Sequence, residues 1–169
     1  MIHDARALRG DGRLRCDLCV VGSGPGGALA ATVAAEAGLR VVVLEAGDFV
    51  TPAQMNQREE EMIPRLLWQA GARMTHDRGV RVHQGRGVGG SSLHNLNLCK
   101  RIPDELLGRW RAERGLEHLP LATWAALYAE VEALLGVSDV PEGAWNRHNR
   151  LLRAGCQALG WRGGGLKHN

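Results

Sequence analysis

The chain has 169 residues, of which 44% are hydrophobic and 23% charged, and its formal net charge is +3. This length fits about one globular domain, and the scattered basic residues, without a block of about five like charges, argue against a nucleic-acid partner. Because no stretch approaches the roughly 18 apolar residues of a membrane helix, and residues 1–15 lack the apolar core of a signal peptide, we expect a cytoplasmic protein without a membrane partner.

The first predicted element is a buried parallel strand at residues 16–21, CDLCVV. It contains a CxxC pair, Cys16 and Cys19, but side chains at this spacing on a strand point to opposite faces and could not easily share one metal ion. No second cysteine pair follows, and the 7 histidines form no constellation at metal-ligand spacing. The sequence therefore predicts no metal site, and cysteines that are buried and reduced.

A glycine-rich turn, GSGPGG at residues 22–27, joins this strand to a predicted helix at residues 28–37, which the next glycine ends. A second strand is expected at residues 39–44, LRVVVL, and leads directly to Glu45. Strand, helix and strand together form a βαβ unit within residues 14–47. This is the setting that a GxGxxG dinucleotide-binding fingerprint requires.

Three glycines of this turn are each explained by a separate structural requirement. Gly22 permits the tight turn out of the strand, Gly24 lets the backbone approach a pyrophosphate, and Gly27 allows close packing of helix on strand. The phosphates would then rest on free N–H groups at the positive end of the helix. Glu45, about 20 residues further on, can accept hydrogen bonds from the ribose 2′- and 3′-hydroxyls and would repel a 2′-phosphate, which disfavours NADP.

Shorter elements are expected beyond this unit. Residues 52–73 have helical spacing that Pro64 interrupts, and residues 80–83 alternate like a short strand. A second glycine-rich segment, GRGVGGSSLHN at residues 85–95, follows at once. Glycine loses more entropy on ordering than any other residue, so this many glycines make sense where backbone lies against a large flat cofactor.

Residues 103–160 form a predicted helical region. Pro103 followed by two acidic residues favours a helix start, and residues 124–135 place apolar side chains on one helical stripe that a glycine ends. A last helix is expected at residues 145–159. The tail at residues 162–169 contains no predicted element, so we expect the chain to stop in mid-fold.

The two glycine segments together carry a resemblance to a known family. VVGSGPGG (20–27), LEAG (44–47) and the 85–95 segment resemble the N-terminal portion of the glucose-methanol-choline (GMC) oxidoreductases, flavin enzymes that act on alcohols. The continuation at residues 102–110 is similar to the subgroup of long-chain-alcohol oxidases and related dehydrogenases, and the resemblance is strongest over residues 14–110. In the second segment the matching residues are Gly85, Arg86, Gly87, Gly89, Gly90, Ser91, Ser92 and Asn95.

This resemblance implies an α/β fold: a Rossmann-like FAD-binding βαβ unit with additional helices, an incomplete portion of a larger flavoprotein. Residues 1–169 would then be the N-terminal part of an FAD-binding domain, with the substrate domain absent. FAD is the implied cofactor and partner, and an alcohol is a substrate only of the completed enzyme. The implied cofactor-binding residues are Gly22, Gly24, Pro25, Gly26, Gly27, Glu45, Ala46, Arg86, Gly87, Gly89, Gly90, Ser91, His94 and Asn95.

His94 stands immediately before Asn95, where choline-oxidase-like members carry a His bound covalently to the 8α-methyl carbon of the flavin. It is either such a tether or a His that lines the flavin site or forms a local hydrogen bond. The family's catalytic base is a His, paired with a second His or an Asn, near the far C-terminus. No counterpart is found in this sequence, so no catalytic residue is predicted.

Three functions stay open from the sequence. The favoured one is the FAD-binding N-terminal segment of an alcohol-oxidising flavoenzyme, inactive alone. The second is a non-catalytic nucleotide-binding or interaction module that completes a C-terminal partner chain. The third is a small NAD-binding protein, against which the 85–95 segment argues.

Overall fold

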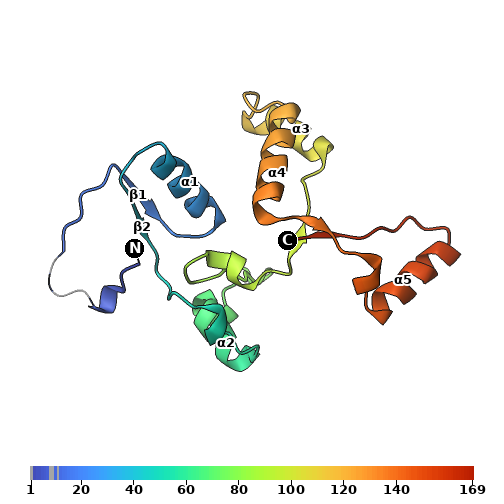
Figure 1. Cartoon of the computed structure of the whole chain (residues 1–169), viewed down its shortest axis with the longest axis horizontal. Helices are drawn as coiled ribbons and strands as arrows, with labels where there is room; N and C mark the ends of the chain where they lie inside the picture. Colours follow the sequence, from blue (N-terminus) through green and yellow to red (C-terminus); the bar gives the residue numbers. More distant parts are fainter. Residues whose placement is uncertain (1, 8–9, 11) are drawn as a thin grey trace. The chain divides into compact units, whose positions relative to one another are not determined.

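A computed structural model describes residues 2–7, 10 and 12–169 of the chain (Figure 1). The described residues form a mixture of helices and strands in two compact units. The first unit runs up to Asn95 and the second from Leu96 to Asn169. None of the helices in this described part is both long and apolar enough to cross a bilayer.

The first unit is built on a βαβ arrangement. Strand β1 (Leu18–Val21), helix α1 (Pro25–Glu36) and strand β2 (Val41–Leu44) follow one another, and Figure 1 shows α1 alongside the two strands. The strands pair in parallel, with Leu18 opposite Val41. This confirms the predicted α/β fold with a Rossmann-like unit.

Both strands begin two residues later than predicted, and an ion pair between Asp17 and Arg40 lies directly before them. The N–H of Asp17 donates to the carbonyl of Arg40 at 2.8 Å, and the Arg40 guanidinium donates to the Asp17 carboxylate at 2.7 Å. The hydrogen bond from Arg40 lowers the pKa of Asp17. The ion pair therefore joins the two segments that lead directly into β1 and β2.

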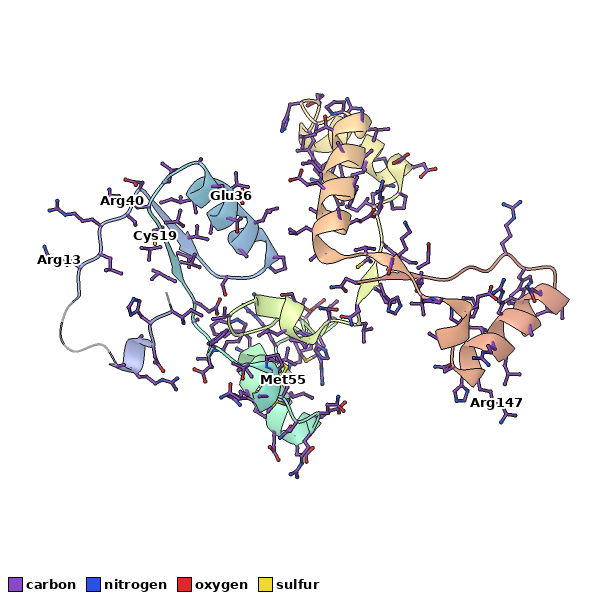
Figure 2. All side chains as sticks on the ribbon, viewed as in Figure 1. Arg13, Cys19, Glu36, Arg40, Met55 and Arg147 are labelled. Carbon is purple, nitrogen blue, oxygen red and sulfur yellow. The ribbon has the colours of Figure 1, made fainter. Side chains whose placement is uncertain are left out.

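The prediction that β1 is buried is wrong. Val21 is 83% exposed on β1, and Val33 is 59% exposed on α1. A parallel strand is buried when both faces of its sheet are covered, and one helix covers one face. Cys19 projects from β1 and is also exposed, contrary to prediction, while all four cysteines are free (Figure 2).

The stretch after β2 contains one helix and several 3₁₀ turns. Helix α2 (Glu59–Leu66) runs through Pro64 and ends two residues later, and the buried Leu66 and Leu67 anchor it. The remaining turns of this unit are η1 (Ala5–Ala7), η2 (Pro52–Gln54), η3 (Trp68–Gly71) and η4 (Gly90–His94).

Residues 80–83 do not form the predicted strand. Arg81 makes a single antiparallel bridge with Met74, and no longer ladder develops in this part of the described chain. Between them Asp77 accepts hydrogen bonds from the Thr75 hydroxyl and the Gly79 N–H, which folds a tight turn. The alternating residues 80–83 thus follow a tight turn, and their pairing is limited to one bridge, which is too short for a strand.

The second unit contains a small antiparallel sheet of β3 (Leu98–Cys99), β4 (Ser138–Asp139) and β5 (Lys167–His168). β5 lies in the centre, between β3 and β4. The expectation that the tail carries no element is therefore wrong. A strand of two residues is too short for a period-two pattern to reveal it.

Three helices complete this unit: α3 (Asp104–Arg114), α4 (Leu121–Leu135) and α5 (Arg147–Ala158), with the turn η5 (Glu142–Ala144) before α5. Leu107, 2% exposed, is the most buried side chain of the unit. The apolar stripe of α4, predicted from the helical spacing of residues 124–135, is largely exposed: Leu134 is 77% exposed. Arg101 pairs with Glu132 of α4 at 2.6 Å and lies over the ring of Tyr128.

Candidate functional site

The turn between β1 and α1 holds the first glycine loop. Gly22 has φ +94° and donates its N–H to the Leu44 carbonyl at 2.7 Å, which ties the turn to the end of β2. A Cβ at position 27 would collide with the carbonyl oxygen of Gly22. The helix can therefore lie this close to the strand only because residue 27 is glycine, as the sequence predicts.

Helix α1 begins without a side-chain cap. Gly24 is the N-cap residue and Pro25 the first helical residue. Because glycine has no side chain, no capping hydrogen bond covers the start of the helix. A Cβ at Gly26 would meet nothing within 4 Å among the described atoms, and one at Gly24 only the Cα of Gly90 at 3.9 Å. Open backbone at the positive end of a helix favours an anion such as a phosphate.

Glu45, directly after β2, is held against this loop. Its Oε2 accepts hydrogen bonds from the Ser23 N–H at 2.9 Å and the Ser23 hydroxyl at 2.7 Å, and its Oε1 accepts one from the Gly47 N–H at 2.9 Å. Partial burial raises the pKa of Glu45, but the hydrogen bonds from Ser23, Gly47 and Ala46 outweigh it and hold the pKa below its ordinary value. The carboxylate is therefore ionised and fixed in direction.

The second glycine loop lies on the first. The N–H of Gly89 donates to the Ser23 hydroxyl at 3.1 Å, and a Cβ at Gly90 would stand 2.8 Å from the Cα of Gly24. Gly89 and Gly90 have φ of +104° and +59°, a region that favours glycine. Two segments far apart in the sequence thus form one continuous backbone surface.

Hydroxyl and amide side chains fix the shape of the second loop. The Ser91 hydroxyl accepts from the Gly85 N–H at 2.9 Å, and the Ser92 hydroxyl donates to the Gly89 carbonyl at 2.7 Å. The Asn95 amide donates to the Ser92 carbonyl at 2.8 Å. These side chains are thus hydrogen-bonded within the loop, and Gly87 of the same loop, with φ +155°, is buried.

Arg86 places a positive charge beside the loops. Its guanidinium lies over the Trp68 ring, 5.2 Å from the centroid, and its terminal nitrogen donates to the Ala46 carbonyl at 3.4 Å. The backbone N–H of Arg86 donates to the Leu66 carbonyl at 2.7 Å. The side chain is exposed, so its charge is available to an anion.

His94 ends the turn η4. Its Nε2 is inaccessible to solvent and has no hydrogen-bond partner among the residues that the structure describes. The first unit therefore contains all the predicted cofactor-facing residues, gathered on the two loops and the end of β2. Among those described residues no group of three His, Cys, Asp or Glu side chains is placed to hold a metal.

Sequence reasoning missed three residues at this site. Ser23 occupies a variable position of the GxGxxG pattern, and its hydroxyl group could have marked it as a hydrogen-bonding residue. Gly47 is less evident from the sequence. A Cβ there would collide with the backbone of Gly87, a contact that exists only in the folded loops. Trp68, which lies under Arg86, carries no signal in the sequence.

Two protein-family models match the sequence of this chain. The profile of GMC oxidoreductases matches residues 63–169. That of the NAD(P)-binding Rossmann-like domain matches residues 20–89. The first match contains the second glycine loop. The second begins within β1, runs through α1 and β2, and ends at residue 89, inside the second glycine loop.

Similar proteins agree with these matches. Long-chain-alcohol oxidase FAO1 of Arabidopsis thaliana is 35% identical over 150 residues, which cover 88% of this chain and 19% of the oxidase. An uncharacterized GMC-type oxidoreductase of Mycobacterium tuberculosis strain H37Rv is 36% identical over 157 residues, 92% of this chain and 25% of that protein. The uncharacterized GMC-type oxidoreductase y4nJ of Sinorhizobium fredii is 31% identical over 164 residues, which cover 95% of this chain and 32% of that protein. The chain spans between 19% and 32% of these relatives' lengths, and it belongs to the GMC oxidoreductase family, whose N-terminal portion it matches.

Proposed function

We propose that this chain is the FAD-binding N-terminal segment of an oxidoreductase that acts on the CH–OH group of alcohols. The observation that carries the proposal is the contact between the two glycine loops, where the Gly89 N–H meets the Ser23 hydroxyl at 3.1 Å. FAD and NAD share the ADP half that the first loop would bind, so the second loop favours FAD. The similarity to a long-chain-alcohol oxidase supports an alcohol as substrate of the completed enzyme.

The arrangement of the loops assigns a part of the cofactor to each. The open start of α1 at Gly24 and Gly26 would hold the pyrophosphate, and exposed Arg86 would offset its charge. Residues 85–95 would lie along the flavin side. When bound, FAD would supply the hydride acceptor for alcohol oxidation. The proposed binding residues are Gly22, Gly24, Pro25, Gly26, Gly27, Glu45, Ala46, Arg86, Gly87, Gly89, Gly90, Ser91, His94 and Asn95.

Glu45 would recognise the adenosine ribose. A carboxylate oxygen can accept more than one hydrogen bond, so a ribose hydroxyl would share the Glu45 oxygens with the donors of Ser23 and Gly47. The same ionised carboxylate would repel a 2′-phosphate, so a phosphorylated ribose is disfavoured.

Titration calorimetry of the 169-residue chain with FAD tests the assignment. FAD should bind, and NADH in excess should not displace it. Glu45→Gln should weaken FAD binding by about 1–3 kcal/mol, the cost of leaving a polar group without its partner. Glu36→Gln, at the exposed end of α1, is the matched control and should bind like the parent. A chain that binds NADH and takes up no FAD would contradict the proposal.

His94 is the candidate flavin tether. The alternative is a His that lines the flavin site or forms a local hydrogen bond. If His94 forms the tether, acid precipitation of FAD-loaded protein should leave the yellow colour in the pellet, and His94→Ala should release it. Flavin found wholly in the supernatant of the parent protein rules the tether out and leaves non-covalent binding.

A further inference from the structure

We propose that Ser23 is a positioning residue that fixes the Glu45 carboxylate and the second glycine loop with a single hydroxyl group. The inference deepens the proposed FAD function and rests on it for the identity of the ligand. The Ser23 hydroxyl is 2.7 Å from Oε2 of Glu45, and the N–H of Gly89 is 3.1 Å from the same hydroxyl oxygen. One side chain thus connects the end of β2 with a loop 66 residues away in sequence.

The direction of this chain of hydrogen bonds follows from the atoms. A serine hydroxyl has one proton to donate and lone pairs to accept. Two acceptors lie near that proton: Oε2 of Glu45 at 2.7 Å and the Gly87 carbonyl at 3.5 Å. The carboxylate is closer and charged, so it takes the proton, and charge-assisted bonds of this kind are the stronger ones. The hydroxyl oxygen then points its lone pairs at the Gly89 N–H.

The connection is partly buried, which strengthens it. Ser23, Glu45 and Gly89 are all half-buried, and hydrogen bonds away from bulk water polarise one another. The Ser23 N–H also donates to Oε2, so the residue holds Glu45 at two points. Removal of the hydroxyl leaves the backbone bond but unlinks Gly89. Ser23 therefore couples the proposed ribose-binding end of the site with the proposed flavin-side loop.

A substitution series separates this role from general stability. Ser23→Ala removes the hydroxyl, and Ser23→Thr retains it. Thr32→Ala is the matched control, because its exposed hydroxyl donates to the Ala28 carbonyl within α1. Circular dichroism checks that every variant is folded.

Two readouts need no cofactor. In Ser23→Ala, the pKa of Glu45, followed by carbon NMR, should rise towards its ordinary value, and the Gly89 amide should exchange with solvent at least about tenfold faster. Ser23→Thr should restore both properties, and Thr32→Ala should change neither. An unchanged Glu45 pKa and unchanged Gly89 exchange in folded Ser23→Ala overturn the positioning role.

FAD affinity gives the third readout. Ser23→Ala should weaken FAD binding about tenfold, the size expected for one lost bond to a charged group. Glu45→Gln combined with Ser23→Ala should cost less than the sum of the single changes, because both act through one connection. Fully additive losses would overturn the coupling. A parent chain that binds no FAD refutes the proposed function, while the NMR readouts still decide the role of Ser23.

Discussion

Gly90 is the residue on which the approach of the two loops depends most directly. Its φ is +59°, and a Cβ there would stand 2.8 Å from the Cα of Gly24. Both the conformation and the space thus require glycine. Gly26 lies in the same surface but has open space in front of it, so the two glycines form a natural comparison.

Gly90→Ala should destabilise the first unit by about 1–2 kcal/mol or more, because the left-handed conformation alone costs an L-residue that much. Urea unfolding of the chain without cofactor measures the change. Gly26→Ala, placed in the first turn of α1, should not lower the free energy of unfolding, because alanine favours a helix more than glycine does. Equal stability of the two variants would show that the loops do not touch as described.

The roles of single residues were only partly predictable. Those of Gly22 and Gly27 follow from the local order of strand, turn and helix, and the sequence identified both. A Cβ at Gly47 would collide with the backbone of Arg86 and Gly87, which lie far away in the sequence. Such contacts depend on how two loops meet, which no local pattern records. The same holds for the bond between Ser23 and Gly89.

At the scale of elements, helix ends were the most predictable features. Gly136 ends α4 with φ +67°, and Gly38 and Gly160 follow α1 and α5 with positive φ. Glycine suits these positions because the left-handed conformation carries no steric cost for it. Strands were less predictable: β3, β4 and β5 have two residues each, too few for a hydrophobic pattern.

Leu107 should contribute most to holding α3 in the second unit. It is 2% exposed, so Leu107→Ala should cost about 2–5 kcal/mol through lost burial and the cavity left behind. Leu134→Ala, on the exposed stripe of α4, is the control and should change stability by less than about 0.5 kcal/mol. Urea unfolding followed by circular dichroism and tryptophan fluorescence measures both. A loss for Leu134→Ala as large as that for Leu107→Ala would mean that the stripe is covered.

At the scale of the whole molecule, apolar surface is left uncovered in both units. Val21 is 83% exposed on β1 and Leu134 77% exposed on α4. The sequence predicted Val21 in a buried strand and Leu134 on an apolar helical stripe. A periodic pattern shows which face is apolar, but it cannot show what covers that face.

We expect the 169-residue chain, even when saturated with FAD, to oxidise no alcohol. The chain covers 19% of the length of the Arabidopsis thaliana oxidase, and its two loops offer mainly backbone groups and hydroxyls. A positioned base contributes a factor of about 10²–10⁴, and a substrate pocket contributes positioning as well. Oxygen uptake and dye reduction with long-chain alcohols measure the activity. Turnover at a rate typical of flavoenzymes would show that the chain is sufficient by itself.

The central place of β5 has a consequence for the order in which the second unit assembles on the ribosome. β3 and β4 each pair with β5, the strand that is synthesised last of the three. The helices between them emerge earlier and contain only local hydrogen bonds, which form fast. The sheet must wait until Lys167 and His168 have left the exit tunnel. A ribosome stalled shortly before these codons would therefore hold a nascent chain in which neither pairing of this sheet is made.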